Sequence, residues 1–283
     1  MTSRLRFAVV GNPIAHSRSP EIHQLFARQF GIELTYEKLL APVDDFAAVA
    51  KAFFDDGGSG LNVTVPFKQD AARWVDVLDP TAAAVGAVNT IYAGSAARAE
   101  DDQQIWHGAN TDGAGLLADL VRLGWPVQGQ RIALLGAGGA ARGALHALLQ
   151  AAPASVVVAN RTRATAEQLA RELAPSAPAV PLLTEAPVAL REPFDLLINA
   201  TSLGLSAGAE AFSALLPRLG LDGTRCYDMV YGDNTAFLRF AADRSAAAIA
   251  DGFGMLIGQA AVAFEHWHGV RPSLEDTLKA LQA

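Results

Sequence analysis

The chain has 283 residues, of which 51% are hydrophobic and 18% are charged, and its formal net charge is -7. This length suits two domains that each bury a core, and the acidic balance argues against broad nucleic-acid binding. The chain has no run of 18 apolar residues that would predict a membrane span, and a single cysteine, Cys226, excludes an internal disulfide. We therefore expect a cytoplasmic protein, as a monomer or a homodimer.

The first part of the chain alternates short apolar runs with helical spacing. This alternation predicts a mostly parallel β-sheet covered by helices. The expected strands and helices, in chain order, are residues 7–10, 20–30, 34–39, 46–54 and 61–65.

The same alternation restarts after Gly129 and predicts a second α/β domain. We place the domain boundaries at Asp112 and near Gly252, and the residues alone leave open which domain the last helices join. The expected strands are 132–135, 155–159, 195–200 and 225–229, and the expected helices are 140–150, 253–268 and 273–281.

A glycine-rich turn lies between the predicted strand 132–135 and the helix that follows it. Its spacing places Gly136 at a tight turn, Gly138 where a pyrophosphate approaches the backbone, and Ala141 where helix and strand pack closely. The N-terminus of the helix adds unpaired N–H groups that favour phosphate. The pattern predicts a dinucleotide site, and the alternative is a turn without a ligand.

The end of the strand 155–159 distinguishes NADP from NAD. An NAD site carries a carboxylate there for the ribose 2′-hydroxyl, whereas this chain has Asn160, Arg161 and Thr162. The Arg161 guanidinium suits a 2′-phosphate through charge-assisted hydrogen bonds. We predict NADP, and the alternative is that Arg161 and Arg163 are solvated and cap a loop.

Two hydroxyl side chains, Ser17 and Ser19, lie two residues apart where a helix begins. At a helix N-terminus, such a pair makes a neutral cradle for a carboxylate. Pro20 suits the first helical position, so Ser19 can equally be a simple N-cap. The residues alone leave both interpretations open.

The strand 61–65 and the residues after it carry polar groups at the strand end. Period two places Asn62 and Thr64 on one face of the strand. Pro66 ends the strand, and Lys68 then falls in the first turn of a helix, where a cation is electrostatically disfavoured. An acid/base group and an ordinary surface lysine are both compatible with this position.

Further polar residues stand at predicted element ends. Asp112 opens a helix and is most simply its N-cap, and Asn89 precedes a strand. Tyr231 follows the strand 225–229, and Gln259 lies one helical turn after Met255.

The order of these motifs resembles the shikimate dehydrogenase family from residue 11 to about residue 269. Each motif is modest alone, but together they are specific. They are residues 12–20 (NPIAHSRSP), 62–68 (NVTVPFK), 86–90 (GAVNT), 110–113 (NTDG), 136–140 (GAGGA), 160–162 (NRT), 227–229 (YDM) and 251–255 (DGFGM).

The resemblance implies a fold and a set of site residues. Residues 1–111, completed by 252–283, would form an α/β substrate-binding domain, and residues 112–251 a Rossmann-type NADP-binding domain. Lys68 and Asp112 would be the catalytic pair. Ser17 and Ser19 would hold the substrate carboxylate, Asn62, Thr64, Asn89 and Gln259 would bind ring hydroxyls, and Tyr231 would line the site. The cofactor would contact Gly136, Gly138, Gly139, Ala140, Asn160, Arg161, Thr162, Met229 and Gly252.

The implied reaction is the reversible NADPH-dependent reduction of 3-dehydroshikimate to shikimate, which needs no metal. The chain departs from the family at Thr165, where a second arginine often stands, so the phosphate clamp is predicted only at Arg161. One alternative is a quinate/shikimate dehydrogenase that prefers NAD, which an acidic residue at position 161 would favour. Another is a non-catalytic ligand sensor, which loss of Lys68 or Asp112 would favour.

Overall fold

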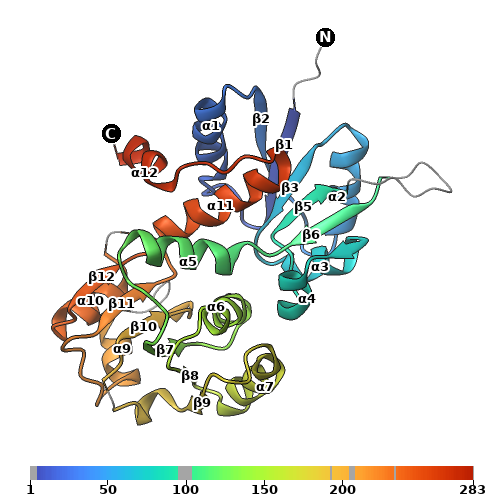
Figure 1. Ribbon diagram of the computed structural model, residues 1–283. Coiled ribbons are helices and arrows are strands. Elements are labelled where there is room, and N and C mark those ends of the chain that lie inside the picture. Colours follow the sequence, from blue (N-terminus) through green and yellow to red (C-terminus); the bar gives the residue numbers. More distant parts are fainter. Residues whose placement is uncertain (1–4, 95–103, 192, 204–207, 233, 283) are drawn as a thin grey trace. The chain divides into compact units, whose positions relative to one another are not determined.

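A computed structural model describes residues 5–94, 104–191, 193–203, 208–232 and 234–282 (Figure 1). By internal packing the chain divides into two compact units. The first contains the described residues up to Thr111 together with those from Ile257 onward, and the second runs from Asp112 to Leu256. The C-terminal helical segment therefore returns to the first unit.

The first unit is built on a six-stranded sheet in the order β2-β1-β3-β5-β6-β4. Strands β1, β2 and β3 are mutually parallel, whereas β5 runs antiparallel to both β3 and β6. The strands are β1 (Leu5–Gly11), β2 (Leu34–Leu40), β3 (Gly60–Val63), β4 (Val77–Leu78), β5 (Thr90–Ala93) and β6 (Trp106–Ala109). The helices are α1 (Ser19–Phe30), α2 (Phe46–Asp55), α3 (Lys68–Trp74), α4 (Pro80–Val85), the part of α11 (Phe253–His268) from Ile257, and α12 (Leu274–Gln282).

Alternation along the strands divides the core of this unit between the two faces of its sheet. Ala8 and Val10 of β1 face a cluster that includes Phe46 of α2. On the other face, the Phe7 ring stacks on Trp267 of α11 with ring centroids 4.5 Å apart. Strand period two therefore puts α2 and α3 against one face and α1 and α11 against the other.

The second unit has six parallel strands in the order β12-β11-β10-β7-β8-β9, which is the doubly wound arrangement of dinucleotide-binding folds. Its strands are β7 (Arg131–Leu135), β8 (Ser155–Ala159), β9 (Leu182–Glu185), β10 (Leu196–Asn199), β11 (Arg225–Asp228) and β12 (Ala248–Ala250). Its helices are α5 (Asp112–Arg122), α6 (Gly139–Gln150), α7 (Arg163–Leu173), α9 (Ala209–Leu215), α10 (Ala236–Asp243) and short 3-10 turns at Ala174–Ser176 and Pro187–Ala189.

Helices cover both faces of the second sheet. Leu120 of α5 and Leu145 of α6 share a cluster with Ile132 and Leu134 of β7. The opposite face carries Phe212 of α9 and Phe237 of α10, packed with Leu135 and other strand residues. Both faces being buried accounts for the nearly continuous apolar runs of these strands. The expected fold class, a two-domain α/β protein with a Rossmann-type second domain, is confirmed.

The structure moves some expected boundaries. The strand predicted to reach residue 65 ends at Val63, and Val65 is 62% exposed. Helix α1 begins at Ser19 with Arg18 as its N-cap, and no side chain caps it. Ser19 is therefore not the N-cap that its sequence position allows.

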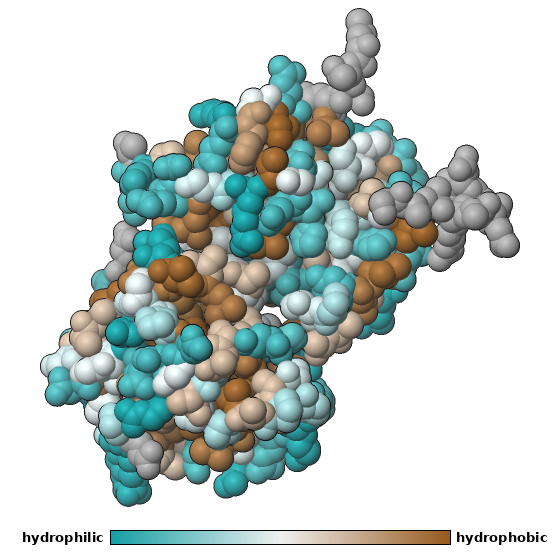
Figure 2. Space-filling view, viewed as in Figure 1, coloured by the Kyte–Doolittle hydropathy of each residue, from teal (hydrophilic) through white to brown (hydrophobic). Residues whose placement is uncertain are grey.

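Within the described residues, no helix is long and apolar enough to cross a membrane, and no three histidine, cysteine or acidic side chains gather as a metal site would require. Hydrophilic and hydrophobic residues are interspersed on the face of the molecule shown in Figure 2. Cys226 is buried, and burial raises the pKa of its thiol to about 12.

Candidate functional site

Asn62 of β3 is the centre of a buried polar network in the first unit. It is 6% exposed. Its Nδ2 donates to the Asn89 carbonyl and to the Thr90 Oγ1, each at 3.1 Å, and its Oδ1 accepts from the Tyr36 hydroxyl at 2.7 Å. The antiparallel pairing of β3 with β5 places Asn62 opposite Thr90, which is why the two side chains meet.

Asn89 extends the network toward the end of β6. Its Oδ1 accepts from the Thr111 N–H at 2.9 Å, and its Nδ2 donates to the Thr111 Oγ1 at 3.0 Å. The Gln259 Oε1 lies 3.5 Å from the Asn89 Nδ2 and 3.4 Å from the Thr111 Oγ1. The structure thus joins Asn62, Asn89 and Gln259, which are distant in sequence.

Ser17 and Ser19 are hydrogen-bonded to each other at the start of α1. The Ser17 hydroxyl donates to the Ser19 Oγ at 3.2 Å, and the Ser19 N–H lies 3.3 Å from the Ser17 Oγ. Ser19 is buried and Ser17 is half-buried. The expected pair of hydroxyls at a helix N-terminus is present, and Ser17, rather than Ser19, receives the main-chain N–H.

Lys68 is half-buried and is the first residue of α3, in the first turn where the sequence placed it. Its carbonyl accepts from the Val88 N–H at 2.8 Å, so its main chain adjoins the residue before Asn89. Asp112, the first residue of α5, directly follows Thr111 in the chain. Thr64 lies beyond the end of β3, and its methyl group would be 2.5 Å from a Cβ added at Gly11.

In the second unit, the turn between β7 and α6 contains several glycines, and the presence of glycine has a different physical explanation at each position. Gly136 has φ +105°, and a Cβ there would lie 3.1 Å from the Ala200 carbonyl oxygen, so the fold itself requires glycine. Gly138 has φ -83° and ψ -170°, which any residue adopts, and a Cβ there or at Gly139 would meet nothing within 4 Å. Packing therefore does not explain Gly138, and the open space beside it leaves the backbone accessible.

The residues after β8 present an exposed arginine. Asn160 Nδ2 donates to the Thr162 carbonyl at 2.9 Å, which closes the turn that leads into α7. Arg163 Nε donates to the Glu167 Oε1 at 2.8 Å. Among the described residues, Arg161 has no ion pair, so its guanidinium is available for a phosphate. The donors of this turn and the open space at Gly138 fit NADP.

The other residues predicted around the cofactor have mixed environments. A Cβ at Gly252 would lie 2.3 Å from the Met229 carbonyl oxygen, so close backbone packing already explains that glycine. Met229 is half-buried after β11. Tyr231, which was predicted to line the substrate site, is 43% exposed, and its ring centroid lies 6.3 Å from that of Phe253.

Sequence reasoning missed a buried cluster at the carboxyl ends of β10 and β11. Asn199 Nδ2 donates to the Asp228 Oδ1 at 2.9 Å, and the Thr201 hydroxyl donates to the Asn199 Oδ1 at 2.7 Å. Burial raises the pKa of Asp228, and its hydrogen bonds, first that from Thr235, oppose the rise. Tyr36, Thr90 and Thr111 were also missed: the latter two lie inside quoted motifs, but Tyr36 carries no sequence signal.

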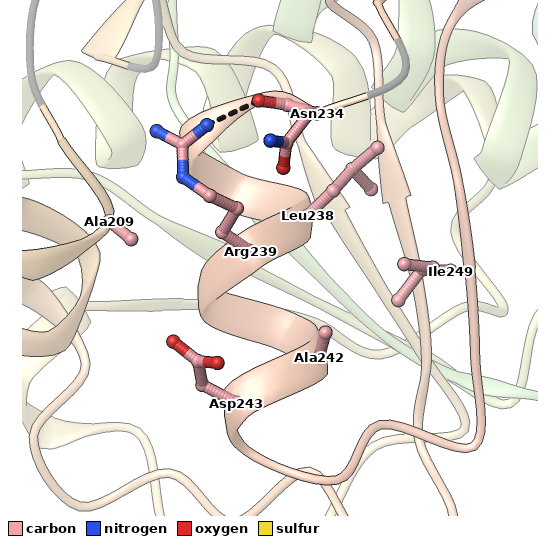
Figure 3. Close-up of a pocket in the computed structure, with 7 residues that line it drawn as sticks. All are labelled: Ala209, Asn234, Leu238, Arg239, Ala242, Asp243 and Ile249. Atoms are coloured by element: carbon pink, nitrogen blue, oxygen red, sulfur yellow. Dashed lines mark hydrogen bonds between the residues drawn. The ribbon is translucent and has the colours of Figure 1, made fainter.

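A separate hollow on the second unit, of about 400 Å³, lies along α10 (Figure 3). The Arg239 guanidinium turns back to the Asn234 carbonyl, and none of the seven lining residues is a predicted site residue. This hollow is therefore not part of the candidate site.

Three family models match the chain. They are described as the shikimate dehydrogenase substrate binding domain (residues 9–91), shikimate / quinate 5-dehydrogenase (residues 120–206) and the shikimate 5'-dehydrogenase C-terminal domain (residues 252–282). With the doubly wound sheet and its glycine-rich turn, they define the class of the protein: a two-domain oxidoreductase that uses a nicotinamide dinucleotide.

Named relatives show to which family within this class the chain belongs. A shikimate dehydrogenase (NADP(+)) of Acinetobacter baylyi is 47% identical over 96% of this chain and 99% of its own length. Among solved structures, an Ael1 enzyme from Pseudomonas putida is 39% identical with a TM-score of 0.85 and 98% coverage of both chains. Shikimate 5-dehydrogenase from Thermus thermophilus, in complex with NADP(H) and shikimate, is 33% identical with a TM-score of 0.80 and 98% coverage of both chains. The chain belongs to the shikimate dehydrogenase family.

Proposed function

We propose that this protein catalyses the reversible NADPH-dependent reduction of 3-dehydroshikimate to shikimate in the biosynthesis of chorismate and the aromatic amino acids. The observation that carries the proposal is the buried network of Asn62, Asn89, Thr111 and Gln259 in a member of this family. Several amide and hydroxyl groups joined in one network suit a polyhydroxylated ring better than an apolar ligand.

The first unit is proposed to bind the substrate. Ser17 and Ser19 would receive the carboxylate, because two hydroxyls and the N-terminus of α1 favour an anion without a full opposing charge. Asn62, Thr64, Asn89 and Gln259 would bind the ring hydroxyls. The match of residues 9–91 to the shikimate dehydrogenase substrate binding domain supports placing the substrate in this unit.

The second unit is proposed to bind NADP. Gly136, Gly138, Gly139 and Ala140 would line the pyrophosphate, and Asn160, Arg161 and Thr162 would bind the 2′-phosphate of the ribose. Met229 and Gly252 would complete the cofactor site, and Tyr231 would line the substrate site. The available guanidinium of Arg161 supports NADP over NAD.

The bound cofactor supplies hydride to the substrate carbonyl carbon. Lys68 and Asp112 are proposed as the catalytic pair, in which Lys68 would stabilise the carbonyl oxygen as it gains negative charge and give it a proton. The side chains that bind the carboxylate and the hydroxyls fix the ring, so that its carbonyl is held in one orientation for the reaction.

A steady-state assay of the purified protein tests the proposal, with shikimate and quinate each measured against NADP and NAD. We expect the highest kcat/KM for shikimate with NADP. A higher kcat/KM for quinate with NAD would replace the proposal by the quinate-using alternative. Saturable binding of shikimate without turnover would favour the sensor.

A further inference from the structure

Tyr36 of β2 is 8% exposed and is hydrogen-bonded to Asn62, a proposed substrate-binding residue. Its hydroxyl donates to the Asn62 Oδ1 at 2.7 Å across 26 residues of sequence. Burial raises the pKa of Tyr36 well above its ordinary value, and a hydrogen bond from Ser19 opposes that rise. The hydroxyl therefore stays protonated and remains a donor wherever the protein is folded.

The hydrogen bonds around Asn62 leave one orientation of its amide. The Asn89 main-chain carbonyl can only accept, so the group facing it must be the Nδ2. The Oδ1 must then face Tyr36. Both amide protons are used within the protein, on Asn89 and Thr90. What Asn62 can still offer a ligand is the second lone pair of an oxygen whose position the Tyr36 hydroxyl fixes.

Tyr36 also lies near the start of α1. The Ser19 side chain is close enough to the Tyr36 hydroxyl to lower its pKa, and Ser19 is hydrogen-bonded to Ser17. Asn62 belongs to β3, a different element. The hydrogen bond of the Tyr36 hydroxyl is to Asn62, a proposed hydroxyl-binding residue.

An aromatic side chain packs against the ring of Tyr36. The Tyr36 ring stacks on the His23 ring with centroids 4.4 Å apart and an interplanar angle of 14°. His23 is fully buried, and neither of its ring nitrogens has a hydrogen-bond partner among the described residues. Trp267 packs on His23 with ring centroids 5.2 Å apart. The hydroxyl is therefore carried by a ring that cannot move sideways without disturbing the core.

We propose that Tyr36 is a positioning residue that fixes the orientation of the Asn62 amide, and so the place at which its oxygen meets a ring hydroxyl of the substrate. Tyr36 acts only through this side chain. This inference rests on the proposed function, because it takes from it that Asn62 binds the substrate.

The Tyr36→Phe variant tests the inference by removing the hydroxyl and keeping the ring. We expect the KM for shikimate to rise about 5- to 30-fold, the range for one lost hydrogen bond that leaves a buried partner unsatisfied. The KM for NADP should stay within twofold, because no cofactor-binding residue is touched.

Tyr227→Phe is the matched control in the second unit. The Tyr227 hydroxyl also donates over 2.7 Å, to the Asp119 Oδ2, and Tyr227 is fully buried. Its loss should lower the melting temperature but leave the KM for shikimate unchanged. An equal rise in KM in both variants would show that the effect follows from lost stability, and it would overturn the inference.

A double-mutant cycle separates positioning from general packing. In an Asn62→Ala background, adding Tyr36→Phe should raise the KM by less than twofold, because the residue through which Tyr36 acts is gone. The same fold-change in both backgrounds would overturn the inference. The melting temperature of each variant shows that it is folded when its KM is measured.

The outcomes distinguish this inference from the proposed function. A wild-type protein that does not oxidise shikimate with NADP contradicts the proposed function itself. An active wild type in which Ser19→Ala and Asn62→Ala raise the KM, but Tyr36→Phe leaves it within twofold, leaves the function intact and overturns the role of Tyr36.

Discussion

Lys68 occupies the start of α3, where main-chain N–H groups repel a cation. If it is the proton donor, Lys68→Ala should lower kcat by about 10²- to 10⁴-fold, the usual contribution of a positioned acid/base group. KM should change little, because the interaction strengthens in the transition state. Steady-state kinetics checks this, with Lys51→Ala, an exposed lysine paired with Asp55, as the control. A kcat within about threefold of wild type would remove Lys68 from the mechanism.

Arg161 and Arg163 differ in their partners although they lie two residues apart. Arg163 is engaged with Glu167, whereas Arg161 is exposed after β8. Arg161→Asp should remove a preference for NADP of about 10- to 150-fold, equivalent to 1.5–3 kcal/mol for a charge-assisted hydrogen bond, and should repel the phosphate. Arg163→Ala should do less. The ratio of kcat/KM for NADP to that for NAD checks both variants. An equal loss of NADP preference in the two variants would show that the 2′-phosphate is not bound mainly by Arg161.

Because His23 is buried, it makes the free energy of unfolding depend on pH. Burial, and next the neighbouring His268, lower the pKa of His23 to about 3. The unfolded chain therefore binds one more proton than the folded protein below about pH 6.5, so stability falls as the pH drops from there toward 3.

Urea unfolding of wild type and His23→Phe checks this expectation. The Phe variant keeps a flat ring against Tyr36 but cannot bind a proton. Between pH 6.5 and 5, the wild type should lose about 2 kcal/mol more of its free energy of unfolding than the variant does. The variant should retain a smaller slope from other groups, including His268, whose pKa is also lowered by burial. Parallel curves for the two proteins would show that His23 is protonated in the folded state.

At the scale of elements, the turn from β7 into α6 offers a test that separates ligand binding from folding. Gly138→Ala places a methyl group in open space at an ordinary φ, so the melting temperature should stay near that of wild type. The methyl would block a pyrophosphate, and the KM for NADP should rise roughly tenfold or more. Gly136→Ala, at φ +105°, should instead lose about 1 kcal/mol or more of stability. Unchanged NADP binding in Gly138→Ala would contradict the assigned site.

How well the sequence predicted each helix or strand depended on the length and burial of that element. Strand β8 and helix α11 were expected at their observed bounds, because a buried parallel strand and a long helix leave strong patterns. The antiparallel β5 and β6 were not located as a pair, because four-residue strands carry too little periodicity. The end of β3 at Val63 was also missed, since Val65 continues the apolar pattern while facing solvent.

At the scale of the whole molecule, two units with separate cores predict two separate ligand responses. Hydrogen exchange should show shikimate slowing exchange around residues 60–64 and 87–90, and NADP slowing it around residues 136–142 and 160–163. A ligand at 100 times its Kd stabilises the state that binds it by about 2.7 kcal/mol. Protection of the first unit by NADP alone, with none in the second, would reverse the proposed roles of the units.

The sequence by itself determined those features of the candidate site whose residues lie close together in the chain. The glycine turn at 136–141, the arginine after the strand and the paired serines could be recognised because the functions proposed for them require short, fixed spacings. Only the tertiary structure decided how the polar residues meet. The bonds of Asn62 to Tyr36 and of Asn89 to Gln259 span 26 and 170 residues, and no periodicity encodes such contacts. They follow instead from strand pairing and from the return of α11 to the first unit, which bury polar groups that must then find one another.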